Sequence, residues 1–295
     1  MQNFIKSCRH QFEYIIFQAL TTLIRLCGID KASNYCAKIA TTIGPWLPIT
    51  RTARRNLYLA FPKLTTRMQQ KIIHDLWDNF GRFIGEFPHI HDLTPEEITK
   101  HIEIIGLENI TTFQKNHQPF ILYTGHFANW DLALRILESL YPTWGVMYRR
   151  ANNNLVNDVI NKWRSSDNIN LIAKGPSGAR SLVKSIKEKH SLCMLVDQKM
   201  NDGISIPFFN RPAMTAHAIA KLALQYDYPI IPAQIVRKNG CQLQITIHPE
   251  LKINRTANEE IEIIRIMTKI NETLEQWIRE NPGQWFWFHN RWGKF

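Results

Sequence analysis

The amino-acid sequence predicts an α/β protein: a single domain in which helices flank a central, mostly parallel sheet, preceded by an N-terminal amphipathic helix. Two observations support this fold class. Short apolar runs rich in β-branched residues alternate with helical patterns from about residue 120 onward. In addition, no Pro-, Gly- or Ser-rich linker and no internal repeat divides the 295 residues.

The predicted elements follow from the periodicity of the apolar residues. Strands are expected at residues 120–123, 145–148, 169–173, 192–196, 230–236 and 243–247. Helices are expected at residues 131–140, 154–164, 178–189, 216–226 and 258–280, and also within residues 30–100. The segment Thr94-Pro95-Glu96-Glu97 has the N-cap, first-turn proline and capping-box glutamate of a helix start.

The charge of the chain indicates a polyanionic partner. The formal net charge is +11, and within residues 1–55 eight Lys or Arg side chains stand against two acidic ones, a local excess of +6. No helix-turn-helix, zinc-finger or RNA-binding aromatic signature accompanies this excess, whereas an apolar helical segment does. An anionic membrane surface is therefore the predicted partner, and nucleic acid is not.

The N-terminal segment has the pattern of an amphipathic helix. Its apolar residues recur at helical spacing: Phe12, Ile15, Ile16, Leu20, Leu23 and Ile24. The apolar stretch, at most residues 14–29, is shorter than the about 20 residues that span a bilayer, and no small-residue cleavage site follows it. We predict that residues 1–45 are a membrane-anchor region that lies in the membrane surface and that residues 46–295 are the main domain. A helix buried in the core is the alternative.

The five cysteines indicate neither a disulfide framework nor a zinc site. Cys8, Cys27, Cys36, Cys193 and Cys241 are odd in number, widely spaced and without a Cys-x-x-Cys pair. A reducing compartment and unreactive, buried thiols are expected, and no metal ligands are predicted.

The candidate chemical centre follows an apolar strand that ends in Thr124-Gly125. His126 begins a turn there, and Asp131 begins a helical pattern five residues later. We predict that the Asp131 carboxylate orients the imidazole of His126, which acts as a general base, and that Gly125 lets the backbone approach a ligand closely. The spacing alone is weak evidence, because His91 and Glu96 repeat it in a charged loop. A purely structural histidine is the alternative.

The sequence around this centre resembles a known superfamily. Residues 125–131, Gly-His-Phe-Ala-Asn-Trp-Asp, are similar to the His-x4-Asp/Glu block of the lysophospholipid acyltransferases. Five further regions contain Arg54-Arg55-Asn56…Phe61-Pro62, Trp77…Gly81-Arg82…Glu86, Tyr148-Arg149, Asp197-Gln198…Pro212-Ala213 and Pro282…Gln284-Trp285…Arg291-Trp292. In this order they resemble the blocks of one branch, the late acyltransferases of lipid A biosynthesis. Asn210 stands where that branch usually has glycine; because Asn tolerates positive φ, the turn is expected to persist.

The resemblance implies transfer of a fatty acyl chain from acyl carrier protein to a hydroxyl of a lipid A precursor, on the cytoplasmic side of the bacterial inner membrane. His126 and Asp131 would be the catalytic pair, and the carrier-protein thioester would be the acyl donor without a further cofactor. Arg149 and Arg164 are candidates for binding anionic groups or the oxyanion, and Asp197 and Gln198, at a strand end, for contacting substrate.

Several alternatives remain open at this stage. A glycerolipid acyltransferase that uses acyl-coenzyme A should contain a Glu-Gly-Thr-Arg-like block, and none is present. A non-catalytic protein that binds anionic membranes is the other alternative. The basic residues Lys174, Arg180, Lys184, Lys187 and Lys189 either receive an acidic carrier protein or lipid phosphates, or form a solvated helix face. The aromatic residues 285–288 and Trp292 either lie at the membrane or an acyl groove, or form a core strand.

Overall fold

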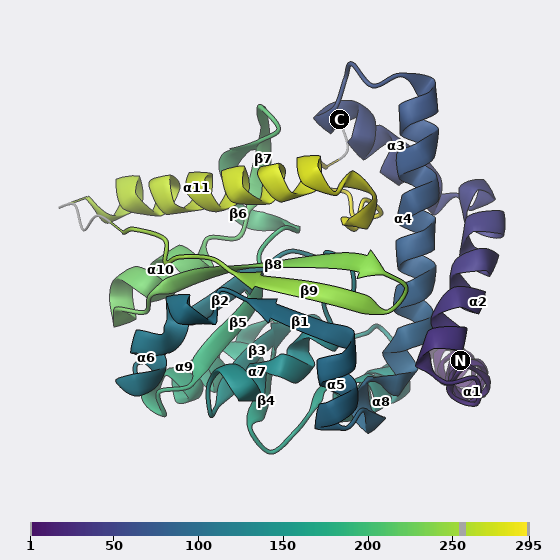
Figure 1. Ribbon diagram of the computed structural model, residues 1–295, viewed down its shortest axis with the longest axis horizontal. Coiled ribbons are helices and arrows are strands. Elements are labelled where there is room, and N and C mark those ends of the chain that lie inside the picture. Colours follow the sequence, from purple (N-terminus) through teal and green to yellow (C-terminus); the bar gives the residue numbers. More distant parts are fainter. Residues whose placement is uncertain (1, 254–257, 294–295) are drawn as a thin grey trace.

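A seven-stranded sheet forms the centre of the computed structural model, which describes residues 2–253 and 258–293 (Figure 1). Its strands, in spatial order, are β1 (Ile102–Ile105), β9 (Gln242–Ile247), β8 (Ile230–Asn239), β2 (Ile121–Thr124), β5 (Ser191–Leu195), β3 (Trp144–Tyr148) and β4 (Ile169–Ala173). The five strands from β8 to β4 are mutually parallel, and β9 runs antiparallel to β8. The carboxyl ends of those five strands therefore meet at one edge of the sheet.

Helices cover both faces of the sheet, so β2 is buried along its whole length. On one face, Tyr123 stacks against Trp277 of α11 (Glu259–Glu280), with ring centroids 6.3 Å apart. On the other face, Leu122 points towards a short helical segment made of η4 (Leu132–Ile136) and α7 (Leu137–Leu140).

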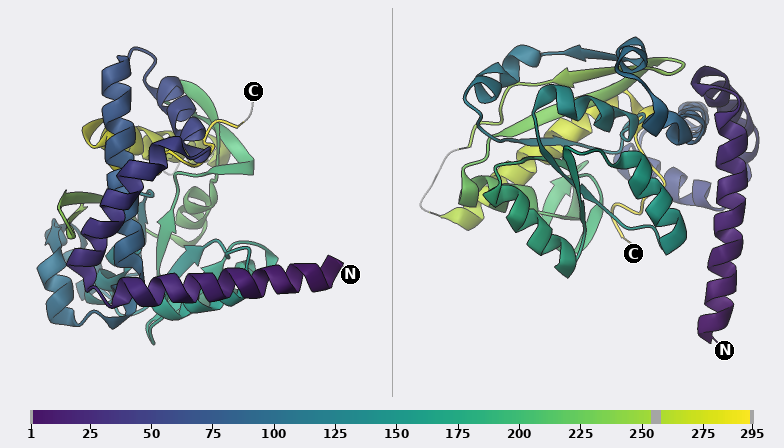
Figure 2. Two further views of the ribbon diagram at one scale, coloured as in Figure 1. Left: turned by 90° about the vertical axis from the view of Figure 1, so that its right-hand side faces the viewer. Right: turned by 90° about the horizontal axis from the view of Figure 1, so that it is seen from below.

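The N-terminal helices lie beside the sheet (Figure 1). They are α1 (Gln2–Arg25), α2 (Ile29–Ile43), α3 (Ile49–Ala60) and α4 (Thr66–Glu86). Helices α2 and α4 touch closely because Gly81 and Gly85 present no Cβ where the α2 backbone passes. Helix α1, in contrast, extends along the outside of the molecule as a long arm (Figure 2). None of the helices within the described residues is long and apolar enough to cross a membrane.

The remaining helices connect the strands or cap the sheet. They are η1 (Gly44–Trp46), η2 (Phe87–Asp92), α5 (Pro95–His101), η3 (Leu107–Ile110), α6 (Thr111–Lys115), α8 (Asn154–Arg164), α9 (Pro176–Lys187), α10 (Ala218–Tyr226) and η5 (Pro282–Gln284). The predicted capping box is confirmed, since Thr94 N donates to Glu97 Oε2 at 2.9 Å and Glu97 N donates to Thr94 Oγ1 at 3.3 Å.

All six predicted strands are present, and the α/β fold class is confirmed. The prediction of one helix over residues 131–140 was wrong in detail, because a 3-10 segment precedes a single α-turn there. Strand β1 and a separate hairpin, β6 (Lys199–Phe208) with β7 (Arg211–Thr215), were not predicted. The hairpin turn has φ of 52° at Phe209 and 56° at Asn210, which confirms positive φ at the asparagine.

Candidate active site

The pairing of β2 with β5 places His126 beside Asp197. Thr124 lies opposite Leu195, and two residues further along each chain are His126 and Asp197. The Nδ1 atom of His126 is 2.7 Å from Asp197 Oδ1, and the backbone N–H of His126 donates to Oδ2 at 2.8 Å. The histidine therefore has a carboxylate partner from the neighbouring parallel strand.

The Asp197 carboxylate is buried, with 1% of the residue exposed. Trp285 Nε1 donates a third hydrogen bond to it, at 2.7 Å. Burial by itself would raise the pKa of this carboxyl, but the nearby His126 and the donated hydrogen bonds outweigh burial and hold the pKa below its usual range. An ionised Asp197 accepts a hydrogen bond from Nδ1–H, so the lone pair of the neutral imidazole lies on Nε2. Gln198 Nε2 is 3.2 Å from that atom.

Gly125 makes room for this carboxylate. A Cβ atom at residue 125 would lie 2.7 Å from the ring of Phe127 and 3.1 Å from Asp197 Oδ2. The close approach that was predicted for a ligand at Gly125 is thus made by the protein's own Asp197 carboxylate and by the ring of Phe127.

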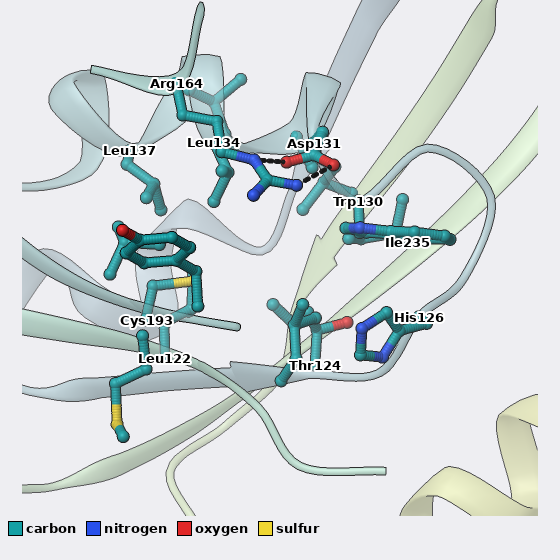
Figure 3. Close-up of a pocket in the computed structure, with 18 of the residues that line it drawn as sticks. Leu122, Thr124, His126, Trp130, Asp131, Leu134, Leu137, Arg164, Cys193 and Ile235 are labelled. Atoms are coloured by element: carbon teal, nitrogen blue, oxygen red, sulfur yellow. Dashed lines mark hydrogen bonds and ion pairs between the residues drawn. The ribbon is translucent and has the colours of Figure 1, made fainter. Parts of the chain in front are cut away.

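The prediction that Asp131 contacts His126 was wrong. Asp131 forms a two-pronged ion pair with Arg164, whose Nε and Nη2 donate to Oδ1 and Oδ2 at 2.6 and 2.8 Å. Figure 3 shows the Asp131 carboxylate turned towards Arg164, away from His126. The physical reason is that Asp131 lies at the start of η4, which faces the carboxyl end of α8, whereas Asp197 already occupies Nδ1 of the imidazole.

His126 and the Asp131–Arg164 pair line one cavity of about 270 Å³ (Figure 3). Its polar lining consists of Thr124, His126, Asp131, Tyr148, Arg149, Arg164, Lys174 and Gln198. Its apolar lining includes Leu122, Leu134, Leu137, Val146, Cys193 and Ile235, which come from the sheet and from the η4–α7 segment. Trp130 and Phe286 contact the imidazole of His126, with ring centroids 4.9 and 6.1 Å away. His126 thus lies where a polar region of the cavity meets an apolar one.

Of the residues predicted for the site, five line this cavity: His126, Asp131, Arg149, Arg164 and Gln198. Asp197 lies behind the histidine instead, so its expected contact with substrate is replaced by a contact with His126. Within the described part of the chain, no cluster of three or more His, Cys, Asp or Glu side chains could hold a metal ion.

A buried ion pair supports the loop between His126 and Asp131. Arg237 Nη1 and Nη2 donate to both oxygens of Glu86, at 2.5 and 2.9 Å, and Glu86 is fully buried. Asn129 Nδ2 donates to the same carboxylate at 2.7 Å, while its Oδ1 accepts from Leu132 N at 2.9 Å. The loop is thereby fixed to helix α4 and strand β8.

The contacts of Glu86 with Arg237 and of Trp285 with Asp197 were not predicted from the sequence. Glu86 and Trp285 fall within recognised blocks, but nothing in the pattern shows which distant partner each one contacts. The pairing of His126 with Asp197 had a usable signal, since both follow apolar strands and parallel strands bring such ends together. The aromatic segment 285–288 is part of the core, with Trp285 and Trp287 buried, yet it pairs with Phe127 through a single bridge rather than as a strand.

The fold and this site together define an α/β protein in which a histidine paired with a buried carboxylate opens onto a cavity that is partly polar and partly apolar. The chain belongs to the bacterial lipid A biosynthesis acyltransferases, whose family model matches residues 1–294. It is 22% identical over 240 residues to a lipid A biosynthesis myristoyltransferase of Escherichia coli K12, covering 80% of this chain and 73% of that one. Among solved structures, a 1-acyl-sn-glycerophosphate acyltransferase of Thermotoga maritima aligns with 83% of this chain and 96% of its own, at 13% identity and a TM-score of 0.37.

His289 gives the protein a predicted sensitivity to acid. Its Nε2 accepts a hydrogen bond from Lys199 N at 2.7 Å. Burial, with the charges of His126, Arg291 and Lys174, lowers its pKa to about 4, although Asp197 acts in the opposite direction. As the pH falls, His289 is therefore protonated in the unfolded chain before it is protonated in the folded protein. The contribution of the neutral histidine to the free energy of unfolding is present above about pH 6.5 and is lost as the pH falls towards 4.

We expect His289→Gln, which retains a hydrogen-bond acceptor, to flatten this decline in the free energy of unfolding. Urea titrations at pH 7, 5.5 and 4.5 measure it. His74→Gln, at an exposed histidine on α4, is the control and should follow the wild type. An equally steep decline in His289→Gln and wild type would contradict the assignment.

Proposed function

We propose that this protein transfers a fatty acyl chain from the thioester of acyl carrier protein to a hydroxyl of a lipid A precursor at the cytoplasmic face of the inner membrane. The observation that supports this most directly is the His126–Asp197 pair beside an apolar cavity. A glycerolipid acceptor with acyl-coenzyme A is less well supported, because the matching family acts in lipid A biosynthesis.

In the proposed reaction, His126 Nε2 removes the proton of the acceptor hydroxyl, and the hydroxyl oxygen attacks the carbonyl carbon of the thioester. Gln198 has to release Nε2 at this step, since it contacts that atom at 3.2 Å in the free protein. Asp197 stabilises the imidazolium that forms, because the carboxylate lies against Nδ1. The tetrahedral intermediate then expels the carrier thiolate, which takes the proton from the imidazolium.

The Asp131–Arg164 pair is proposed to stabilise the oxyanion of the intermediate. Asp131 engages Nε and Nη2 of Arg164, and within the described residues Nη1 makes no hydrogen bond. Asp131 thus fixes the plane of the guanidinium, and Nη1 remains available to donate to developing negative charge. In this proposal Asp131 acts through Arg164 rather than through His126.

The mechanism predicts different consequences for the two aspartates. His126→Ala and Asp197→Asn should each lower kcat about 10²- to 10⁴-fold, because both remove the oriented base. Asp197→Asn should also shift the pH dependence of kcat/KM. Asp131→Asn should lower kcat without changing that pH dependence. The measurement is transfer from labelled acyl carrier protein to a lipid A precursor.

Undiminished activity in both His126→Ala and Asp197→Asn would refute the mechanism. A change in pH dependence for Asp131→Asn alone would restore Asp131 as the partner of the histidine. An inactive wild type would favour the non-catalytic, membrane-binding alternative.

The apolar part of the cavity is proposed to hold the acyl chain. Leu122 and Cys193 lie opposite each other in β2 and β5, four residues before His126 and Asp197, or about 13 Å along a strand. Val146 lies beside Cys193 in register. Burial raises the pKa of the Cys193 thiol to about 12, so this side chain is a neutral lining group.

Filling this end of the cavity should change the preferred donor. Cys193→Phe is expected to lower kcat/KM for long acyl chains relative to short ones by about tenfold or more, since discrimination by a few methylene groups is of that size. Cys193→Ala is the matched control and should retain long-chain transfer. An equal loss for all chain lengths in Cys193→Phe, with unchanged thermal stability, would exclude this part of the cavity as the acyl site.

Residues 1–45 are proposed to dock on the membrane. Apolar side chains with 42–79% of their surface exposed follow one another along α1 and directly after its end: Phe12, Ile15, Ile16, Leu20, Leu23 and Leu26. Further exposed apolar residues are Tyr35, Ile39, Ile43 and Trp46 on α2 and η1. Lys31 and Lys38 are exposed among them. Such a basic, amphipathic surface suits an anionic leaflet.

Vesicle flotation tests this docking surface. The double variant Leu20→Asp/Leu23→Asp should weaken binding to vesicles that contain phosphatidylglycerol about tenfold or more, because two exposed apolar anchors become charged. Ile261→Asp/Ile264→Asp on α11 alters exposed residues of similar size and should leave binding unchanged. Equal loss in both double variants, or in neither, would contradict the proposal.

A further inference from the structure

Two cations lie opposite each other at the ends of adjacent strands. Strands β3 and β4 pair in parallel, with Tyr148 opposite Ala173, so the next residues in register are Arg149 and Lys174. Lys174 N donates to Tyr148 O at 2.8 Å, which continues the pairing to this point. Both side chains line the cavity that contains His126.

The described residues offer these two cations no acidic partner. Neither Arg149 nor Lys174 forms an ion pair, and Arg164, the third cation of the cavity, is already neutralised by Asp131. Lys174 reaches solvent, yet desolvation lowers its pKa; Asp197 opposes this, and Arg149 adds to it. Asp197 is itself fully engaged by His126 and Trp285. Arg149 and Lys174 thus repel each other, and a bound anion would remove this repulsion.

The backbone nearby favours an anion as well. Helix α9 begins at Pro176, two residues after Lys174, and its first turn contains no acidic residue. Its N-terminal end therefore adds positive potential beside the two side chains.

We propose that Arg149 and Lys174 form a binding site for a phosphate monoester on the acceptor lipid. The proposal rests on the proposed function. An arginine provides a planar set of donors and a lysine a compact charge, a combination suited to a phosphate dianion. The site would fix the acceptor headgroup so that its hydroxyl reaches His126.

The acceptor is a better source of this phosphate than the acyl donor. In a carrier protein, the full pantetheine arm separates the phosphate from the reacting thioester. Lys174, in contrast, lies in the same cavity as His126 and close enough to Asp197 to interact with its charge. A phosphate bound there belongs to the molecule whose hydroxyl is activated at close range.

The test compares a phosphorylated acceptor with the same acceptor after phosphatase treatment. Lys174→Met and Arg149→Met should each raise the KM for the phosphorylated acceptor about tenfold, the usual size for loss of a hydrogen bond to a charged group, with a smaller change in kcat. The KM for the dephosphorylated acceptor should stay unchanged in both variants. Lys174→Arg, which retains the charge, should restore most of the loss.

Arg150→Met is the matched control, because Arg150 is exposed, adjacent in sequence and not part of the cavity lining. It should leave both KM values unchanged. An equal loss for the two acceptors, or a KM increase confined to the acyl donor, would overturn the proposal.

A binding experiment separates this proposal from the proposed reaction. The His126→Ala protein in mixed micelles should bind the phosphorylated acceptor more tightly than the dephosphorylated one. The double variant His126→Ala/Lys174→Met should bind the two acceptors equally. A wild type without transferase activity that retains this preference would refute the reaction but support the phosphate site. A wild type that transfers acyl chains but shows no preference for the phosphorylated acceptor would refute the phosphate site and leave the proposed reaction intact.

Discussion

The arrangement of the candidate active site depends on the hydrogen bonds that the buried carboxylate of Asp197 accepts. It joins the end of β2, through His126, to the end of β5 and to Trp285 near the C-terminus. An isolated carboxylate at this depth would favour the protonated form, and the donors around it reverse that preference. The C-terminal aromatic segment therefore helps to keep the carboxylate beside His126 ionised.

A second buried charge pair links the N-terminal helices to the same site. Glu86 accepts hydrogen bonds from Arg237, from Asn129 in the loop between His126 and Asp131, and from Ser33 in α2. Loss of one partner would leave an uncompensated charge in the core, which is far more destabilising than replacement of the whole pair. Helix α1 in turn packs on α8 through the stacked rings of Phe17 and Trp163, 5.6 Å apart. The proposed membrane-docking helix thus rests on the helix that ends at Arg164.

The cavity has a polar end and an apolar end, and this division explains the placement of its charges. Asp131 neutralises Arg164 close to the reacting centre, while Arg149 and Lys174 remain without an acidic partner. The apolar end is formed by side chains that alternate along β2, β5 and β3, so its shape follows from the register of the sheet. A single arrangement of parallel strands accordingly sets both the position of His126 and the boundary between the two ends of the cavity.

The sequence by itself determined the fold class, the six main strands and the capping box at Thr94, because these depend on local periodicity and short motifs, and it singled out His126 as a candidate, which the structure places in the cavity. It also placed Asp197 and Gln198 at a strand end. Which carboxylate contacts His126 was decided only by tertiary structure, since Asp131 and Asp197 are both plausible partners until the register of β2 and β5 is known. The same holds for the neighbouring cations Arg149 and Lys174, which are 25 positions apart in the chain and adjacent only because β3 pairs with β4.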